Sequence, residues 1–353
     1  MTPHRSPSTT RIGVDLCVLG SPYPASLGRC VRSGLRALRE LADVDVVALG
    51  PMGGDRRRWR LRGLPGAARR SGVQGVHSFV SGFSPTAPAP RIQTVHELPW
   101  RHGERENADF GHRLWTRIGA WRAQHVVTPS EHVARDLRAE LGLGDDRVTA
   151  TPWGVDRRFG EAAGEGGATV ELGGEPFDRA TLLLPLGGRA KKRAAAAVEA
   201  LAQLPREVRL VVTGPDGPGL EAARARAAAL SIAPRLHHVP WIAEADLPQA
   251  VAACGAVLAL ARSEGFAHPV LEALATGTAV VAVPDGAQQE LAGECAELAD
   301  PDSPEQLAAA IERALSWNET RRSAARERAA HYDWKRWAEG TARVWRTALE
   351  EAR

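Results

Sequence analysis

Short apolar runs alternate with helical patterns along nearly the whole chain of 353 residues. In the first half, apolar runs include residues 12–19, 44–49 and 75–80, and helical spacing recurs over residues 29–41 and 130–141. Short apolar runs bounded by turn residues are typical of strands buried on both faces of a parallel sheet. Strands that alternate with helices predict an α/β protein with doubly wound sheets.

The length of the chain and a break in its pattern predict two domains. A single core seldom grows beyond about 250–300 residues. Residues 161–179 are rich in Gly, Glu and Ala and show little periodicity, and a second α/β series follows them. We therefore expect an N-terminal domain over residues 1–160, a linker over residues 161–179, a C-terminal domain over residues 180–335 and a last helix over residues 336–353.

Two carboxylates, Glu264 and Glu272, stand eight residues apart around a loop that leads into a helix begun by Pro269. The loop would follow a buried strand, so its amides would face the carboxyl edge of the sheet, where anions and sugar hydroxyls find donors. Two acceptor carboxylates beside free donors predict a site for a polyhydroxylated ligand. The loop amides that would face this edge are those of Gly265, Phe266 and Ala267.

The segment EGFAHPVLEALATGTAVV resembles the E-x7-E signature of the retaining glycosyltransferases of family 4, which have the GT-B fold. Spacing alone is a weak signal, because a carboxylate near the start of a helix often serves only the helix dipole. Other stretches fit the family in the same order along residues 11–350. They are a P-x-G-V-D turn at residues 152–156, where Trp153 replaces the usual Asn, a glycine-rich turn at 211–219, and the segment 239–266 that leads into the signature.

The resemblance implies two Rossmann-like domains that face each other across a cleft, with the C-terminal helix crossing back to the first domain. It implies a retaining hexosyltransferase in which Glu264 contacts the donor sugar and Glu272 the ribose. The donor would be a UDP- or GDP-linked sugar. The acceptor could be an envelope polysaccharide, a lipid-linked molecule or a small molecule, and the resemblance does not choose among them. The alternatives are a nucleotide-sugar epimerase of GT-B architecture and a catalytically silent nucleotide-sugar-binding partner subunit.

Basic residues cluster in LGGRAKKR, residues 186–193, and two of the chain's three lysines lie there. Positive charge at the amino end of a helix opposes the helix dipole unless an anion lies between them, which favours phosphate binding over an exposed basic turn. The family carries Arg and Lys here against the donor diphosphate. Counting back from the following helix assigns these roles to Arg189 and Lys192, with Lys191 as the alternative.

His96 follows a short apolar strand in IQTVHELPW, so its ring should lie at the carboxyl edge of the first sheet. A lone histidine is more often structural, but T-V-H-[DE]-L resembles the family loop whose histidine approaches the transferred sugar. Gly28, after the first strand, corresponds to paired family glycines whose amides approach the donor, although only one glycine is present. His268 lies inside the signature, and its role stays open between sugar contact and packing.

The sequence shows no cluster of histidine and aspartate with metal-ligand spacing, and the four cysteines form no CxxC pair. We therefore expect no metal and no cofactor. Arg189 and Lys192 would stabilise the leaving diphosphate, and its own oxygen would take the proton of the acceptor. No protein nucleophile is needed. The predicted catalytic residues are His96, Arg189, Lys192 and Glu264.

The first 160 residues carry 24 arginines against 15 acidic residues, and much of this excess lies in residues 55–70. Arginines interleaved with apolar residues suit an anionic acceptor or an acidic membrane surface, and the alternative is a solvated loop. Nucleic acid is not expected, because no zinc-finger spacing or aromatic single-strand motif accompanies the patch. No apolar run approaches the roughly 20 residues of a membrane span. We expect a cytoplasmic protein, and contact with the inner membrane face through Arg56–Arg70 stays open beside the solvated loop.

Overall fold

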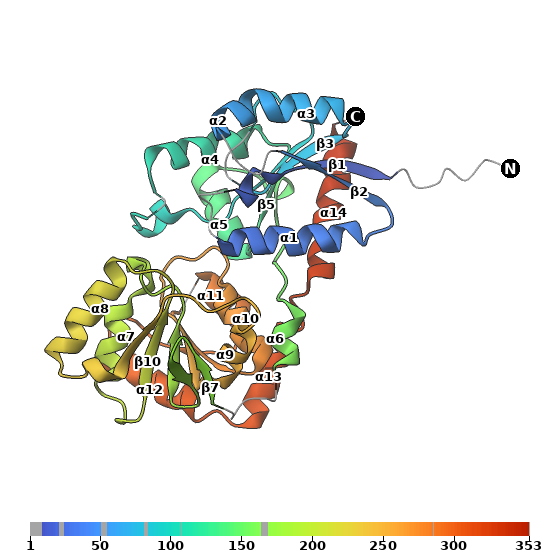
Figure 1. Ribbon diagram of the computed structural model, residues 1–353. Coiled ribbons are helices and arrows are strands. Elements are labelled where there is room, and N and C mark those ends of the chain that lie inside the picture. The colour runs from blue at the N-terminus through green and yellow to red at the C-terminus, as the bar shows by residue number, and fades with distance from the viewer. Residues whose placement is uncertain are drawn as a thin grey trace. The chain divides into compact units, whose positions relative to one another are not determined.

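The computed structural model describes residues 9–20, 25–50, 55–80, 84–106, 108–163, 169–284 and 286–352. The chain divides into two compact units: Met1–Gly154 with Asp333–Arg353, and Val155–Tyr332. In each unit a parallel sheet carries helices on both faces (Figure 1). None of the described helices is long and apolar enough to cross a bilayer.

The first unit is built on a six-stranded parallel sheet in the order β2-β1-β3-β4-β5-β6. All residues of β3 and β5 are buried, as expected for central strands covered on both faces. The strands are β1 (Thr10–Asp15), β2 (Val44–Leu49), β3 (Gly75–Ser78), β4 (Arg91–Thr94), β5 (His125–Thr128) and β6 (Val148–Ala150).

The last helix, α14 (Trp334–Glu351), completes the first unit although the chain reaches it only after the second. It contacts α1 (Ala25–Arg39), and Trp345 Nε1 donates a hydrogen bond of 3.0 Å to His77 Nδ1 on β3. Trp345 is fully buried, so this contact belongs to the core. Other helices of this unit, besides those of the arginine-rich segment described below, are η1 (Leu16–Leu19), η3 (Pro99–His102), α4 (Phe110–Arg122), α5 (Glu131–Leu141) and η4 (Asp145–Arg147).

The second unit contains another six-stranded parallel sheet, in the order β11-β10-β9-β12-β13-β14. The chain runs outward from β9 to β11 and then returns to β12 on the other side of β9, so the winding direction reverses between β9 and β12. Ligands of open α/β sheets bind at the carboxyl ends of the strands at such a switch point. The strands are β9 (Thr181–Leu184), β10 (Arg209–Thr213), β11 (Leu236–Val239), β12 (Ala256–Ala259), β13 (Ala279–Ala282) and β14 (Glu297–Leu298).

Small side chains dominate the core of the second unit and let its helices approach the sheet closely. Ala197 and Ala273, which lie on two of the helices, are both fully buried. The helices are α6 (Arg157–Glu161), η5 (Ala190–Lys192), α7 (Ala194–Leu201), α8 (Pro218–Ala229), η6 (Ala233–Arg235), α9 (Leu247–Ala253), α10 (His268–Thr276), α11 (Gly286–Ala292), α12 (Pro304–Leu315) and α13 (Glu319–Ala329).

Part of the expected linker, residues 161–179, is a structured piece of the second unit. Strands β7 (Val170–Leu172) and β8 (Glu175–Phe177) pair antiparallel. Gly173 and Gly174 join them with φ of 63° and 80°, a conformation that favours glycine in two-residue hairpins. Phe177 is fully buried in the core of the unit. The linker prediction failed here because low periodicity hid a short hairpin.

The arginine-rich segment is helical and is not a solvated loop. It forms α2 (Arg56–Arg58), the π-helix η2 (Trp59–Gly63) and α3 (Leu64–Arg70). Leu64 and Ala68 are fully buried in a small apolar cluster, and Trp59 Nε1 donates a hydrogen bond of 2.9 Å to Asp15 Oδ1. The apolar residues between the arginines therefore anchor the segment to its unit, and contact with a membrane stays a prediction.

Candidate functional site

The switch point of the second sheet brings two predicted site loops together. The loop after β9 carries Lys191 and Lys192, and the loop after β12 carries Glu264. Lys192 Nζ lies 2.7 Å from Glu264 Oε1, and Lys191 Nζ lies 3.6 Å from the same oxygen. Lys191 Nζ also lies 3.4 Å from the carbonyl oxygen of Ser263. Both lysines thus reach the carboxylate, so the structure does not single out one of them.

The loop after β9 follows an unusual backbone path. Leu186 and Arg193, at its two ends, have φ of 57° and 59°, in the left-handed region that residues other than glycine seldom adopt. Between them, a Cβ added to Gly188 would lie 2.1 Å from the carbonyl oxygen of Pro215, so only glycine fits. Such strain persists where the surroundings enforce it, and it clusters at functional sites.

Glu264 stays ionised in this setting. Burial would raise its pKa, but the charges of Lys192 and Lys191, the hydrogen bond from Lys192 and the charge of Arg189 together lower it. The side chains of Lys191, Lys192 and Glu264 are 4%, 11% and 15% exposed. Three positive groups thus act on one carboxylate at the carboxyl edge of the sheet. This concentration of positive charge suits an anionic group.

A small pocket opens beside the ion pair. Gln288, at the start of α11, is fully buried in its wall. Its Nε2 donates a hydrogen bond to the carbonyl oxygen of Ala261, and its Oε1 has no hydrogen-bond partner among the described residues. Sequence reasoning missed Gln288, because nothing local marks a polar residue at this position as buried. The other lining residues are Pro185, Lys192, Leu258, Ala259, Ala261, Glu264, Ala267 and Pro269.

The remaining residues of the signature occupy the loop and helix after β12. Glu272 lies in α10 and is 6% exposed. Gly265 is buried, and Ala267 immediately precedes α10 and lines the pocket. Phe266 packs against the core of the unit, and its ring lies edge-on to that of His268 with 4.8 Å between centroids. The packing role left open for His268 therefore has a contact to support it.

Two family models match successive parts of the chain. The model described as Glycosyltransferase Family 4 matches residues 13–159, and the model described as Glycosyl transferases group 1 matches residues 182–331. The chain belongs to the family 4 glycosyltransferases. The two matches fall on the first sheet and on the second sheet, and their order is the order expected from the sequence motifs. A search of curated protein sequences found no significant match.

Solved structures of glycosyltransferases share the fold over nearly the whole chain. The sucrose-phosphate synthase of Thermosynechococcus elongatus has a TM-score of 0.75 and 19% identity, over 97% of this chain and 99% of that chain. Anabaena Alr3699/HepE in complex with UDP has a TM-score of 0.72 and 16% identity, over 95% and 99%. WaaG, a glycosyltransferase involved in lipopolysaccharide biosynthesis, has a TM-score of 0.63 and 18% identity, over 94% and 99%. This glycosyltransferase therefore has the GT-B fold.

His96 and Gly28 lie in the first unit of the glycosyltransferase. His96 Nε2 lies 2.7 Å from the carbonyl oxygen of Phe79, and burial lowers the pKa of the ring, so neutral His96 donates from Nε2. Trp153, where the family usually has Asn, packs edge-on against it at 5.2 Å. Gly28 lies inside α1, and an added Cβ would meet Arg32 Nη1 at 3.3 Å and Leu19 Cδ2 at 3.8 Å. Both are side-chain ends, so no local backbone contact requires glycine there.

The sequence contains two Asp-x-Asp pairs, a spacing that can hold divalent metals. In the structure every one of these carboxylates contacts an arginine. Asp45 lies 2.7 Å from Arg11, and Asp300 and Asp302 lie 2.7 Å and 2.6 Å from Arg262. The other contacts join Asp43 to Arg346 and Asp302 to Arg193.

Proposed function

We propose that this glycosyltransferase moves a hexosyl group from a nucleotide-diphosphate sugar to an acceptor with retention of anomeric configuration, and that the reaction requires no metal. The observation that carries the proposal is the set of Arg189, Lys191 and Lys192 acting on Glu264 at the switch point of the second sheet. This set supplies positive charge where a diphosphate would gain negative charge on leaving. The relative HepE has been solved with UDP and with UDP-glucose, which supports a nucleotide-linked donor.

Cleavage of the bond between the anomeric carbon and the diphosphate oxygen leaves an oxocarbenium-like sugar and an anionic leaving group. In the proposed reaction the Lys192 ammonium turns from Glu264 towards the leaving phosphate. Glu264 then accepts hydrogen bonds from sugar hydroxyls, while Glu272 binds the ribose. The acceptor oxygen attacks from the face that the diphosphate leaves, and its proton passes to the departing phosphate oxygen. Neutral His96 would contact the transferred sugar.

The acceptor side of the proposal concerns the arginine-rich helices of the first unit. Arg57, Arg58 and Arg62 are exposed, and Leu61 among them is 49% exposed. Basic side chains around an exposed apolar residue suit the headgroups of an acidic membrane. We infer that the enzyme meets a lipid-linked or envelope acceptor peripherally, at the cytoplasmic face of the membrane.

Incubation of the purified protein with UDP- and GDP-sugars, with and without a lipid extract, tests the proposal. Transfer should require the acceptor, survive excess EDTA and give a product with the anomeric configuration of the donor. Interconversion of the donor without an acceptor would identify an epimerase instead. Donor binding without turnover across broad donor and acceptor panels would identify a silent binding subunit.

A further inference from the structure

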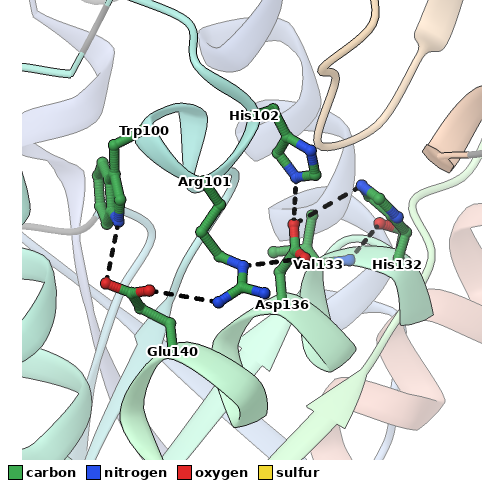
Figure 2. Close-up of polar contacts among 8 residues, drawn as sticks. Trp100, Arg101, His102, His132, Val133, Asp136 and Glu140 are labelled. Carbon is green, nitrogen blue, oxygen red and sulfur yellow. Dashed lines mark hydrogen bonds and ion pairs between the residues drawn. The ribbon is translucent and has the colours of Figure 1, made fainter.

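Three potential metal ligands, His102, His132 and Asp136, converge in the first unit (Figure 2). His102 Nε2 lies 2.6 Å from Asp136 Oδ2, and His132 Nε2 lies 3.7 Å from the same oxygen. One ligand atom from each residue lies within 4.8 Å of the other two. No other group of three such ligands was found in the part of the chain that the structure describes. The spacing in the sequence indicates no histidine and aspartate cluster that could hold a metal, and this cluster shows that the inference from spacing was wrong.

The fold explains why these residues meet. His132 and Asp136 are four residues apart on α5, so they lie on one face of the helix. Ser130 caps the helix by accepting a hydrogen bond of 3.3 Å from the Val133 amide, which fixes the turn that carries His132. His102 ends η3, which follows β4, and β4 pairs directly with β5, the strand before α5. The three ligands therefore gather where the carboxyl ends of two neighbouring strands meet.

We propose that His102, His132 and Asp136 bind a divalent transition metal ion of the Zn²⁺ class. Zn²⁺ accepts imidazole nitrogen and carboxylate oxygen at about 2.0–2.2 Å, and a tetrahedral site then holds its ligand atoms roughly 3.3 Å apart. The spacings of 2.6 Å and 3.7 Å bracket that value, so small side-chain rotations would admit the ion. Two imidazoles among three ligands favour Zn²⁺ over Mg²⁺ and Ca²⁺, which prefer oxygen.

The carboxylate oxygen of Asp136 that faces the two histidines is not the one that contacts Arg101. Arg101 Nε lies 3.3 Å from Asp136 Oδ1, the other carboxylate oxygen, and Arg101 Nη1 lies 3.3 Å from Glu140 Oε2. Glu140 also accepts a hydrogen bond of 3.3 Å from Trp100 Nε1 (Figure 2). The guanidinium lowers the affinity for a cation, but it also orients the carboxylate, as hydrogen-bond partners of metal ligands commonly do.

Burial suits a site of this kind. The side chains of His132 and Asp136 are 11% and 14% exposed, while that of His102 is 26% exposed, which leaves an entry on the η3 side. A bound ion would tie η3 to α5 and keep a fourth position for water or a ligand oxygen. This site belongs to a different unit from Glu264 and uses none of the residues of the proposed reaction, so it goes beyond the proposed function.

The test is titration of the chelator-treated full-length protein with Zn²⁺ by calorimetry, and with Co²⁺ followed by visible absorption. The wild type should bind one equivalent, and Co²⁺ should give the intense visible bands of a tetrahedral site that Zn²⁺ displaces and Mg²⁺ does not. His132→Ala and Asp136→Asn each remove a ligand. Loss of a residue that only supports a metal ligand typically weakens metal binding by roughly 10- to 100-fold. Each of these variants loses a ligand itself, so its Zn²⁺ affinity should fall by more than that.

The matched control is His237→Ala. His237 Nδ1 lies 2.6 Å from Glu175 Oε2, which reproduces one histidine–carboxylate contact without belonging to a group of three ligands among the described residues. Its Zn²⁺ affinity should equal that of the wild type. Absence of saturable Zn²⁺ and Co²⁺ binding by the wild type would overturn the proposal, as would unchanged affinity in a folded Asp136→Asn variant. Neither result depends on glycosyl transfer, so failure here is distinct from failure of the proposed function.

Discussion

Replacement of Lys192 by Ala tests the central electrostatic argument. The substitution removes the ammonium group that lies 2.7 Å from Glu264 and leaves Lys191 at 3.6 Å as the nearest remaining lysine. Loss of one preorganised donor to a developing anion costs on the order of 100- to 1,000-fold in turnover. Because Lys191 already reaches the same carboxylate oxygen, it should replace part of the lost charge. We therefore expect about a 100-fold loss of kcat, which corresponds to about 2.7 kcal/mol.

The double variant Lys191→Ala/Lys192→Ala should lose more than the single variant, because no lysine then remains beside the site. Lys335→Ala is the control. Lys335 is the third lysine of the chain, and it is exposed on α14 in the other unit. Lys191→Ala is unsuitable as a control, since that ammonium group is itself part of the cluster. Removing a hydrogen bond to a charged group should also lower the free energy of unfolding of Lys192→Ala, by about 1.5–3 kcal/mol.

The assay is steady-state turnover at saturating donor, with and without EDTA, together with urea unfolding of each variant. Saturating donor separates lost turnover from weakened binding. Near-normal turnover of Lys192→Ala would refute the reasoning if EDTA also abolished wild-type activity and Mg²⁺ or Mn²⁺ restored it. Restoration by Mg²⁺ also distinguishes that outcome from removal of an ion at His102, a site that disfavours Mg²⁺.

Three further predictions concern the same site and the basic helices. Glu272→Gln should mainly raise the donor dissociation constant, whereas Glu264→Gln should mainly lower the turnover of bound donor. Small and equal effects of the two substitutions would show that neither residue belongs to the site. The pKa of Glu264 is lower in the folded protein than its usual value of 4.5, so its stabilising contribution is complete above pH 4.5 and is lost as pH falls through the folded value. The difference in unfolding free energy between wild type and Glu264→Gln, measured by urea titration at several pH values, should shrink accordingly, and a constant difference would contradict this. Replacing the exposed Arg57, Arg58 and Arg62 by Ser should reduce flotation with anionic but not neutral vesicles at low salt, and equal flotation of both proteins would leave these helices without a membrane role.

The sequence predicts those strands whose burial produces a recognisable run of apolar residues. Strands such as β9 and β13 are buried on both faces, so they appear as continuous apolar runs that can be recognised without the structure. The only sign of the hairpin at residues 170–177 in the sequence is a Gly-Gly pair, which fits a linker equally well. The arginine-rich helices were missed because their apolar anchors, such as Leu64 and Ala68, are too few to give a clear helical period.

Site residues could be predicted where they directly follow a strand, because parallel strands bring their carboxyl ends to one edge. Glu264 and the two lysines meet for that reason. The choice between Lys191 and Lys192 could not be made from sequence, since η5 sends both ammonium groups towards one carboxylate. His132 and Asp136 carried a readable spacing of four residues, but the third ligand comes from a separate loop whose path only the tertiary structure reveals.

The burial of Gln288 is visible only in the folded structure, and its contacts give one more prediction. Among the described residues its buried Oε1 has no hydrogen-bond partner, at a cost of about 1–3 kcal/mol, while Nε2 donates a hydrogen bond to the carbonyl oxygen of Ala261, which shortly precedes Glu264. Gln288→Leu removes this unpaired oxygen but also leaves the Ala261 carbonyl without its donor, so the two effects should largely cancel in the free energy of unfolding. The lost hydrogen bond from Nε2 to Ala261 contributes about 0.5–1.5 kcal/mol, so its loss should lower kcat/KM by about 2- to 10-fold. A variant that is destabilised yet fully active would show that the amide serves packing alone.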